Sequence, residues 1–128
     1  MDWEILPDRP VYLQLVEQLE LAVLTGEYAP GQRIPPVREL AAEAAVNPNT
    51  MQRALAQLED RGLLETHRTA GRTVTGDPGR IAALRGQRAA ECARAYLAAA
   101  QRLGLSPAQA VALARQAADP DAHHETEV

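Results

Sequence analysis

The chain has 128 residues, which allows one domain, or one small domain with an appended segment. Its composition, 46% hydrophobic and 23% charged, is that of a globular protein and excludes an intrinsically disordered one. The 13 basic residues are all arginine and stand against 17 acids, giving a net charge of −4. This balance disfavours a protein that coats nucleic acid indiscriminately, although it leaves room for a local basic surface.

Aliphatic residues must form the core, because aromatic residues make up only 3% of the sequence, while alanine, a strong helix former, occurs 25 times. The single cysteine, Cys92, excludes an internal disulfide and is predicted to be a small core residue. No stretch approaches the ~20 apolar residues of a membrane-spanning helix. The N-terminus lacks the basic and apolar regions of a secretion signal, so we expect a cytoplasmic protein with no membrane partner.

A first helix is predicted over residues 11–25, where apolar residues recur on one face at about 100° per residue. That face consists of Leu15, Leu19, Ala22 and Val23. Polar residues of the same stretch, including Gln14 and Glu20, are expected mostly on the other faces. Gly26 ends the helix, and the segment 27–36, rich in proline and glycine, forms a tight connector.

A helix-turn-helix is predicted next. A short helix fits residues 37–44, and a third helix follows Asn47, a good N-cap residue, with Pro48 at its first position and Gly62 as its stop. A connection of about three residues between two helices is typical of the helix-turn-helix. The buried face of the third helix is expected to carry Met51, Ala54, Leu55 and Leu58.

A small β-hairpin directly after the third helix is in the position of a wing. Residues 64–67 and 73–75 are predicted as its strands, with Thr69, Ala70 and Gly71 at the tip. The predicted fold class is therefore mainly α with a small hairpin: a winged helix-turn-helix domain over residues 1–76, followed by two C-terminal helices.

The two C-terminal helices follow a break at residues 77–79. The first covers residues 80–103, with a broad stripe made of Ile81, Leu84, Cys92, Tyr96, Ala99 and Leu103. The second, capped by Ser106, runs to about Ala118. We expect residues 77–118 to be a dimerisation region and the polar residues 119–128 to be a disordered tail.

The exposed face of the third helix carries Asn49, Gln52 and Arg53 in its N-terminal half. Asn, Gln and Arg side chains can make paired hydrogen bonds to adenine and guanine edges in a major groove, and recognition helices read with this half. Glu59 and Asp60 lie at the other end of the helix. An ordinary solvated helix face is the alternative, and composition alone favours that alternative.

An ordered set of motifs over about 65 residues, half of the chain, resembles the winged-helix DNA-binding domain of the GntR family of bacterial transcription regulators. The matching residues, in family order, are Pro10–Gln14, Gly26, Pro30–Gly31, Ile34–Pro35, Val37–Ala41, Val46–Pro48, Thr50, Ala54–Leu55, Leu58–Glu59 and Gly62–Leu63. Such a set is far more specific than a single helix-turn-helix match.

The resemblance implies DNA contacts at specific positions. Arg38, at the start of the second helix, would contact a base, with a surface ion pair to Glu39 or Glu43 as the alternative. The remaining implied contacts are Asn47, Asn49, Thr50, Gln52 and Arg53 on the turn and third helix, and Arg68, Gly71 and Arg72 in the wing. Pro36 stands where the family usually has serine, so the side-chain cap of the second helix is lost. Thr69 stands where the family usually has a wing glycine, so the wing is expected to have a different turn.

Only about 50 residues follow the wing, too few for the large effector domains of the family, so the chain looks like the short-tailed, YtrA-like subfamily. Two helices with an apolar stripe cannot bury that stripe alone, and a second copy would cover it, with Tyr96, Leu97 and Leu103 as central candidates. The alternative is that both helices fold back on their own winged domain. A symmetric dimer would match a pseudo-palindromic DNA site.

The stretch from Thr66 to Arg102 holds seven arginines and two acids, which is compatible either with a solvated face or with a basic shoulder in which Arg80 and Arg85 contact phosphates. We find no catalytic constellation and no phosphate loop, and His123 and His124 make no ligand set, so we expect no enzyme, no cofactor and no metal.

The sequence therefore predicts a dimeric repressor that binds operator DNA. A winged-helix protein-interaction module is the alternative, a small enzyme is disfavoured, and an activating or plasmid-maintenance role stays open. The sequence does not identify an effector.

Overall fold

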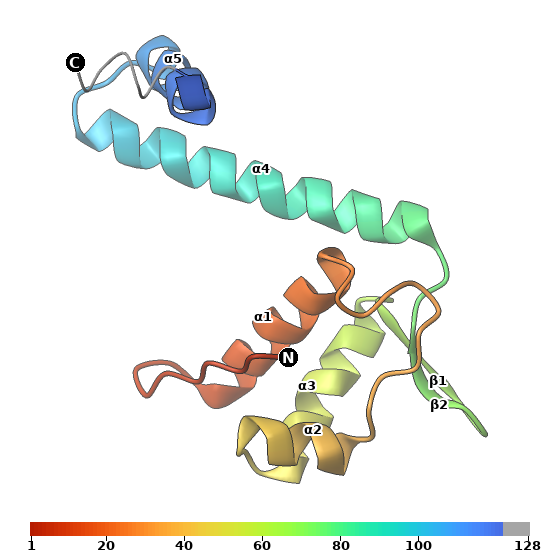
Figure 1. The fold of residues 1–128 in the computed structure, drawn as a ribbon. Coiled ribbons are helices and arrows are strands. Elements are labelled where there is room, and N and C mark those ends of the chain that lie inside the picture. The colour runs from red at the N-terminus through yellow and green to blue at the C-terminus, as the bar shows by residue number, and fades with distance from the viewer. Residues whose placement is uncertain (122–128) are drawn as a thin grey trace. The chain divides into compact units, whose positions relative to one another are not determined.

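The computed structural model describes residues 1–121, which contain five helices and one two-stranded antiparallel sheet (Figure 1). This confirms the predicted fold class. In chain order the elements are α1 (Val11–Leu24), α2 (Val37–Ala44), α3 (Pro48–Asp60), β1 (Leu64–His67), β2 (Gly71–Val74), α4 (Pro78–Arg102) and α5 (Pro107–Ala118). The chain divides into two compact units, which we call the winged unit (Met1–Arg85) and the C-terminal unit (Gly86–Val128).

The core of the winged unit lies between α1, α2, α3 and the base of the hairpin. Each apolar side chain predicted to be buried on the first and third helices is buried: Leu15, Leu19, Ala22, Val23, Met51, Ala54, Leu55 and Leu58. Leu40, Leu63, Leu64 and Val74 complete this core from α2 and the hairpin. Burial of aliphatic surface is the main stabilising term here, at about 25 cal/mol per Å².

The turn between α2 and α3 matches the predicted cap and adds one strained residue. The Asn47 side chain accepts a hydrogen bond from the Asn49 backbone N–H at 2.7 Å, and Pro48 is the first helical residue. Ala45 closes α2 in the left-handed region, with φ 57°. That conformation costs an L-residue about 1–2 kcal/mol, and nothing in the sequence predicted an alanine there.

The second strand of the hairpin begins two residues earlier and ends one residue earlier than predicted. The register pairs His67 with Gly71 and Leu64 with Val74, so Gly71 opens β2 instead of lying in the tip, and Thr75 lies outside the strand. Three residues, 68–70, therefore form the tip. A positive φ of 72° at Gly71 allows this short connection.

The connector before α2 is extended along the outer edge of β2. The backbone N–H of Ile34 donates to the Arg72 carbonyl at 3.0 Å, and the Val74 N–H donates to the Gln32 carbonyl at 2.9 Å. The predicted tight connector is thus tied to the hairpin like a short third strand, which shortens the exposed edge of the sheet.

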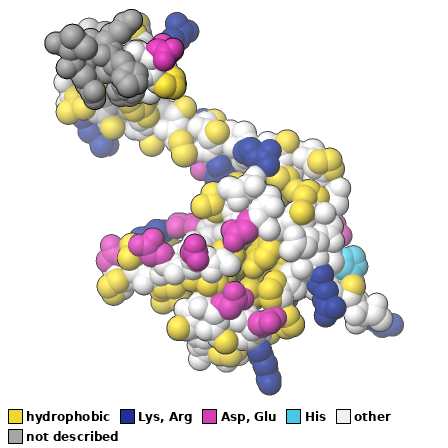
Figure 2. Space-filling view, viewed as in Figure 1, with side chains coloured by type: hydrophobic (Ala, Val, Ile, Leu, Met, Phe, Trp, Pro, Cys, Tyr) yellow, Lys and Arg dark blue, Asp and Glu magenta, His cyan; other side chains and the backbone are white. Residues whose placement is uncertain are grey.

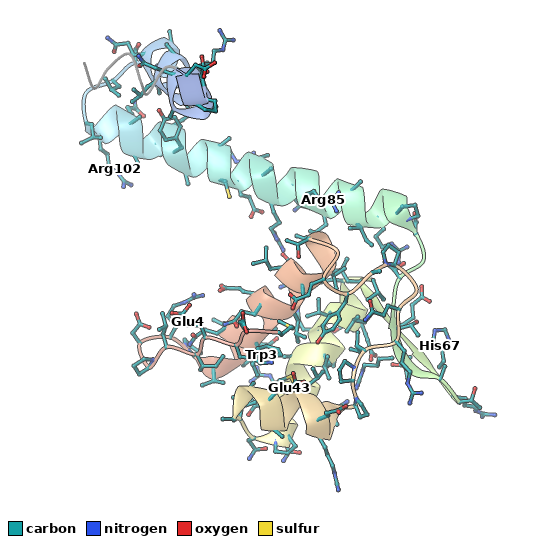
Figure 3. All side chains as sticks on the ribbon, viewed as in Figure 1. Trp3, Glu4, Glu43, His67, Arg85 and Arg102 are labelled. Carbon is teal, nitrogen blue, oxygen red and sulfur yellow. The ribbon has the colours of Figure 1, made fainter. Side chains whose placement is uncertain are left out.

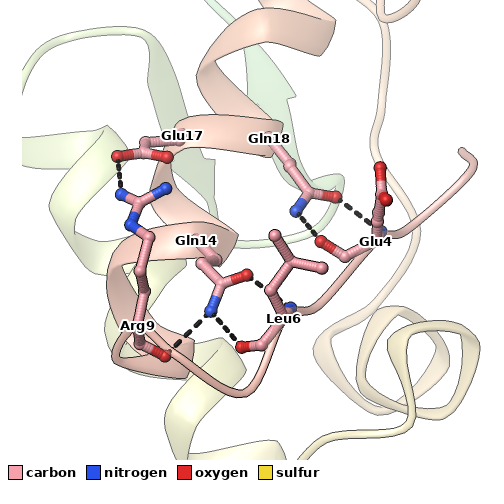
Figure 4. A network of polar contacts seen from close by, with 6 residues as sticks. All are labelled: Glu4, Leu6, Arg9, Gln14, Glu17 and Gln18. Carbon is pink, nitrogen blue, oxygen red and sulfur yellow. Dashed lines mark hydrogen bonds and ion pairs between the residues drawn. The ribbon is translucent and has the colours of Figure 1, made fainter.

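The N-terminal residues are fixed to α1 by two glutamine side chains (Figure 4). The Gln14 amide donates to the carbonyls of Leu6 and Arg9 and accepts from the Leu6 N–H at 2.7 Å. The Gln18 amide bonds in the same two-way manner to the Glu4 backbone. Gln14 is consequently buried, and the expectation that it lies off the buried face is wrong, because a side-chain amide can satisfy buried backbone groups.

Glu20 is the second buried polar residue of α1 that was expected elsewhere. Its carboxylate accepts a hydrogen bond from the Arg61 guanidinium at 2.6 Å, just beyond the end of α3. Buried charges of this kind are tolerated when they are paired. This long-range pair between α1 and α3 has no signal in the local spacing of the sequence.

α4 begins at Pro78, two residues earlier than predicted, because the Asp77 side chain accepts from the Gly79 N–H at 2.9 Å and caps the helix. Its first two turns belong to the winged unit. Arg80 donates to the Gly62 carbonyl at 3.2 Å. Arg85, labelled on α4 in Figure 3, donates to the Leu24 carbonyl at the end of α1, at 2.6 and 3.1 Å. These two arginines cap the C-terminal ends of α3 and α1.

The C-terminal unit is built from the rest of α4 and from α5. Ser106 and Gln109 form a reciprocal capping box at the start of α5, which confirms the predicted N-cap. Ala100 and Ala110 are buried between the helices, and the Tyr96 hydroxyl donates to the Ala110 carbonyl at 2.8 Å. Cys92 is exposed, so its prediction as a core residue is wrong.

None of the helices described is long and apolar enough to cross a membrane.

Candidate nucleic-acid interface

Arg38 lies in the first turn of α2 and is exposed. It forms no hydrogen bond or ion pair with any residue of the described chain, so the pairing with Glu39 or Glu43 that we held as an alternative is absent. Pro36 provides no side-chain cap to α2, as its departure from the family pattern implied. Arg38 therefore belongs to the first turn of a helix, where the backbone N–H groups without a helical partner favour an anion.

The N-terminal half of α3 presents a row of polar side chains. Asn49, Gln52 and Arg53 are exposed, Thr50 is half-buried, and the Asn47 side chain is occupied by its capping bond. The acids of α3 lie at the other end of the helix, where Glu59 is also tied to the hairpin. The exposed row thus carries donors and acceptors without a nearby carboxylate on its own helix.

One of these side chains has a specific support. The Arg53 guanidinium carbon lies 4.0 Å from the centre of the Tyr12 ring, at the start of α1. The Tyr12 hydroxyl in turn donates to Gln57 Oε1 at 3.2 Å, one turn further along α3. Sequence reasoning placed Arg53 on this face but missed Tyr12, because the contact joins residues 41 positions apart.

The hairpin holds two of the predicted wing arginines in different environments. Arg68 lies at the tip, exposed and without a partner among the described residues. Arg72 donates through Nε to Glu59 on α3, which also accepts from the Thr66 hydroxyl at 2.6 Å. The terminal nitrogens of Arg72 make no hydrogen bond to the described chain. Arg72 therefore ties the wing to α3 while it keeps donors for another group.

The Glu59 carboxylate is stabilised in its charged form by this contact. Burial alone would raise its pKa, but the hydrogen bonds from Thr66 and Arg72 and the charge of Arg72 together lower the pKa below its ordinary value. The wing is thus joined to α3 by a charge-assisted hydrogen bond at neutral pH.

Arg33 is a basic residue of this surface that sequence reasoning missed. Its backbone pairs with Thr73 on the edge of β2, and its side chain lies next to Gly71. A groove of about 270 Å³ lies beside it, lined by residues 33–37 of the connector and by Thr66, Gly71 and Arg72 of the hairpin. The sequence did offer one sign of this position, because Arg33 is a charged residue in the connector directly before Ile34 and Pro35.

Charge is segregated on the face of the winged unit seen in Figure 2. Acidic side chains gather over α1 and also lie over α2, whereas basic side chains project outward at the α2 end and at the hairpin tip. Arg80 and Arg85, for which we left a phosphate-contacting role open, are both exposed and each donates to a backbone carbonyl of the winged unit. The unpartnered cations therefore lie at the α2 and wing end of the unit, away from α1.

The C-terminal unit presents a different kind of surface. An apolar groove of about 350 Å³ is lined by Ala93, Tyr96, Leu97, Val111, Ala114, Arg115 and Ala118. The predicted interface residues Tyr96 and Leu97 both line it, while Leu103 lies outside it and is 82% exposed. Val111 and Leu113 are also large apolar side chains left in contact with solvent.

A search for metal ligands among residues 1–121 finds no group of three His, Cys, Asp or Glu side chains that could hold an ion. His123 and His124 lie outside the described residues. The exposed side chains at the α2 and wing end offer guanidinium and amide groups, which bind nucleic acid by hydrogen bonds and charge.

Comparisons with known proteins agree with this chemistry. The sequence profile of the bacterial regulatory proteins of the gntR family matches residues 11–74. YhcF of Bacillus subtilis, an uncharacterized HTH-type transcriptional regulator, is 31% identical over 106 residues, 83% of this chain and 88% of YhcF. The HTH-type transcriptional repressor YtrA of the same organism is 42% identical over 62 residues, which are 48% of each protein.

Among solved structures, a GntR family transcriptional regulator from Listeria monocytogenes has a TM-score of 0.81 at 31% identity, covering 88% of this chain and 98% of that one.

Proposed function

This chain belongs to the GntR family of bacterial regulatory proteins and carries the family's DNA-binding helix-turn-helix, and we propose that it acts in the cytoplasm as a dimeric repressor on a pseudo-palindromic operator. The observation that carries the proposal is that Arg38, at the start of α2, is exposed and has no partner in the described chain, while the N-terminal half of α3 exposes Asn49, Gln52 and Arg53. A repressor of this kind acts by occluding a promoter.

In the proposed complex, base contacts come from four side chains. Arg38 donates to a guanine edge from the start of α2, and Asn49, Gln52 and Arg53 read the major groove from the N-terminal half of α3. Each good paired contact of this type contributes about 1–3 kcal/mol of discrimination against the wrong base. Gel shifts on single-base variants of the operator assign each of these contacts.

The phosphate contacts are proposed for the turn and the wing. Asn47 and Thr50 offer groups at the start of α3. In the wing, Arg68 offers an exposed guanidinium, Gly71 a close approach of the backbone, and Arg72 two free terminal nitrogens. Contacts of this kind position the protein without reading sequence. Their loss is expected to weaken binding evenly and to flatten its salt dependence.

The test of DNA recognition is selection from a random duplex pool, followed by gel shifts on the enriched sequence. We expect a palindrome to be enriched. Arg38→Ala should abolish specific binding with the fold intact, whereas the matched exposed arginine Arg94→Ala on the C-terminal unit should leave affinity within about twofold. Unchanged operator affinity of Arg38→Ala would remove that residue from the site.

We assign residues 1–76 to DNA binding and residues 77–118 to dimerisation. The support is the apolar groove of the C-terminal unit, whose helices bury only small alanine side chains against each other. A second copy would cover Tyr96, Leu97 and the exposed Leu103, since unpartnered apolar helix faces associate in water.

Sedimentation velocity tests the dimer. Leu97→Arg places a charge in the groove and should give a monomer that binds the palindrome at least tenfold more weakly. Ala95→Arg, an equal charge on an exposed position of the same helix, is the control and should remain a dimer. Equal sedimentation of both variants would contradict the assignment.

A protein-interaction module without DNA binding is the second candidate, favoured by the net charge of −4. Residues 1–75 carry eleven acids and seven arginines, so the winged half is the more acidic half. Random DNA should therefore bind weakly, and specific contacts must provide much of the affinity. Failure of the pool selection to enrich any sequence would favour this second function.

A further inference from the structure

We propose that Tyr12, a residue of α1, is a positioning residue that sets the Arg53 guanidinium for its contact with DNA. This inference rests on the proposed function, because Arg53 must lie in the DNA interface for the positioning to matter. It adds an aromatic residue outside the helix-turn-helix to the set that determines affinity.

The geometry fixes both partners. The Arg53 guanidinium carbon lies 4.0 Å from the Tyr12 ring centre, well within the ~6 Å range of a cation–π contact. The ring itself is held at its far end, because its hydroxyl donates to Gln57 at 3.2 Å. Arg53 and Gln57 are four residues apart and thus on the same face of α3, so the Tyr12 ring lies along that face.

The chemistry of the guanidinium makes stacking compatible with DNA binding. Tyr12 occupies the planar face of the Arg53 side chain, whereas hydrogen bonds to a base or a phosphate use the N–H groups at its edge. A free arginine must lose its rotamer freedom when it binds, and a stacked one has lost much of it beforehand. Stacking therefore favours binding without consuming a donor.

Other arginines of the winged unit show the contrast. Arg61 donates to Glu20 and Arg72 donates to Glu59, so each spends donors on a carboxylate. Arg38 and Arg68 have no partner in the described chain. Within residues 1–121, Arg53 is the arginine stacked on an aromatic ring, in a sequence that has three tyrosines and one tryptophan.

A double-mutant cycle tests the proposal. The probe is a fluorescent duplex of the sequence that the full-length wild-type chain selects from a random pool, with a shuffled duplex of equal composition beside it. We expect Tyr12→Leu to raise the Kd for the selected duplex roughly threefold to tenfold. In the Arg53→Ala background, Tyr12→Leu should add less than about twofold, because its effect passes through Arg53.

Tyr12→Phe is the matched control. It keeps the ring under the guanidinium and loses the bond to Gln57, so its Kd should stay within about twofold of wild type. Tyr12 also packs against the core, and thermal melts of all variants therefore confirm that each is folded at the assay temperature. A purely structural role would lower affinity equally in both Arg53 backgrounds.

The outcomes distinguish failure of the role of Tyr12 from failure of the proposed DNA-binding function. Additive losses of affinity in the cycle would overturn the role of Tyr12. Tighter binding by Tyr12→Leu would overturn it too, because it would mean that the ring holds Arg53 away from DNA. Failure of the wild-type chain to select any duplex would overturn the proposed function, and the present inference with it.

Discussion

The winged unit and the C-terminal unit differ in the size of the apolar side chains that they bury. In the winged unit, α1, α2, α3 and the hairpin enclose fully buried leucines such as Leu15, Leu40 and Leu55. In the C-terminal unit, the buried apolar residues described are Ala100 and Ala110. Large side chains there stay exposed, including Leu103 at 82% and Leu113 at 48%.

This difference indicates how much burial of apolar side chains within the single chain stabilises each unit. Leucines enclosed on all sides stabilise the winged unit from within its own chain, whereas alanines remove little apolar area from water. The large side chains that are fully buried in the described chain therefore all belong to the winged unit, although Leu13 and Leu21 of α1 stay about half exposed. Substitutions that distinguish these two situations test the comparison directly.

The largest effect is expected in the core of the winged unit. Leu55→Ala removes a fully buried side chain of α3 and should lower the free energy of unfolding by about 2–5 kcal/mol. Urea unfolding followed by the fluorescence of Trp3, the single tryptophan, measures it at any protein concentration.

Leu113→Ala is the matched substitution in the C-terminal unit. In dilute protein it should change stability by no more than about 0.5 kcal/mol, because Leu113 is half exposed in the single chain. A cost that grows with protein concentration would sharpen the comparison, since it would show that a second copy covers Leu113. An equal cost of both substitutions in dilute protein would break it.

Gly62→Ala is expected to have the next largest effect. Gly62 has φ 77°, a conformation that costs other residues about 1–2 kcal/mol, and an added Cβ would lie 2.6 Å from Arg80 Nη1. Stability measured by urea unfolding should fall by at least that amount. In Gly62→Ala with Arg80→Ala the steric part disappears and the backbone part remains, so the double variant should lose less than the sum of the two single changes.

Gly86→Ala should act in the opposite direction. Gly86 lies within α4 as the first residue of the C-terminal unit, and a Cβ there meets nothing within 4 Å. Alanine stabilises a helix interior by roughly 0.5–1 kcal/mol relative to glycine. Far-ultraviolet circular dichroism during thermal unfolding should show a higher melting temperature, and a lower one would mean that α4 is not continuous at this point in solution.

The sequence predicted the helical parts of both units well, because their signals are local. Proline at first helical positions, Asn47 and Ser106 as caps, and the spacing of Met51 and Leu55 each depend on neighbours within a few residues. The hairpin was less accurate: the spacing of polar and apolar residues did not show that Gly71 pairs with His67.

The features that the sequence missed are tertiary. The bond of Glu20 to Arg61 and the stacking of Arg53 on Tyr12 join residues about forty positions apart, for which spacing carries no information. Cys92 was misjudged because burial on α4 beyond its first turns is limited to a narrow contact with α5, which includes Ala100 and leaves Cys92 outside. The candidate DNA contacts could be named from motifs, while their supports could not.

The smallest effect concerns the contact of the wing with α3, which belongs to the winged unit alone. Folding lowers the pKa of Glu59 below its ordinary value of 4.5. The charged carboxylate therefore stabilises the folded chain at pH values above 4.5. The contribution is lost as the pH falls from about 4.5, through the lowered pKa of the folded state. Glu59→Gln keeps an acceptor but has no charge to lose. We expect the urea midpoint of wild type to exceed that of Glu59→Gln at pH 7, and the gap to close progressively as the pH falls below about 4.5 and the carboxylate takes up its proton. A gap that stays constant over this range would show that the Glu59 charge does not hold the wing.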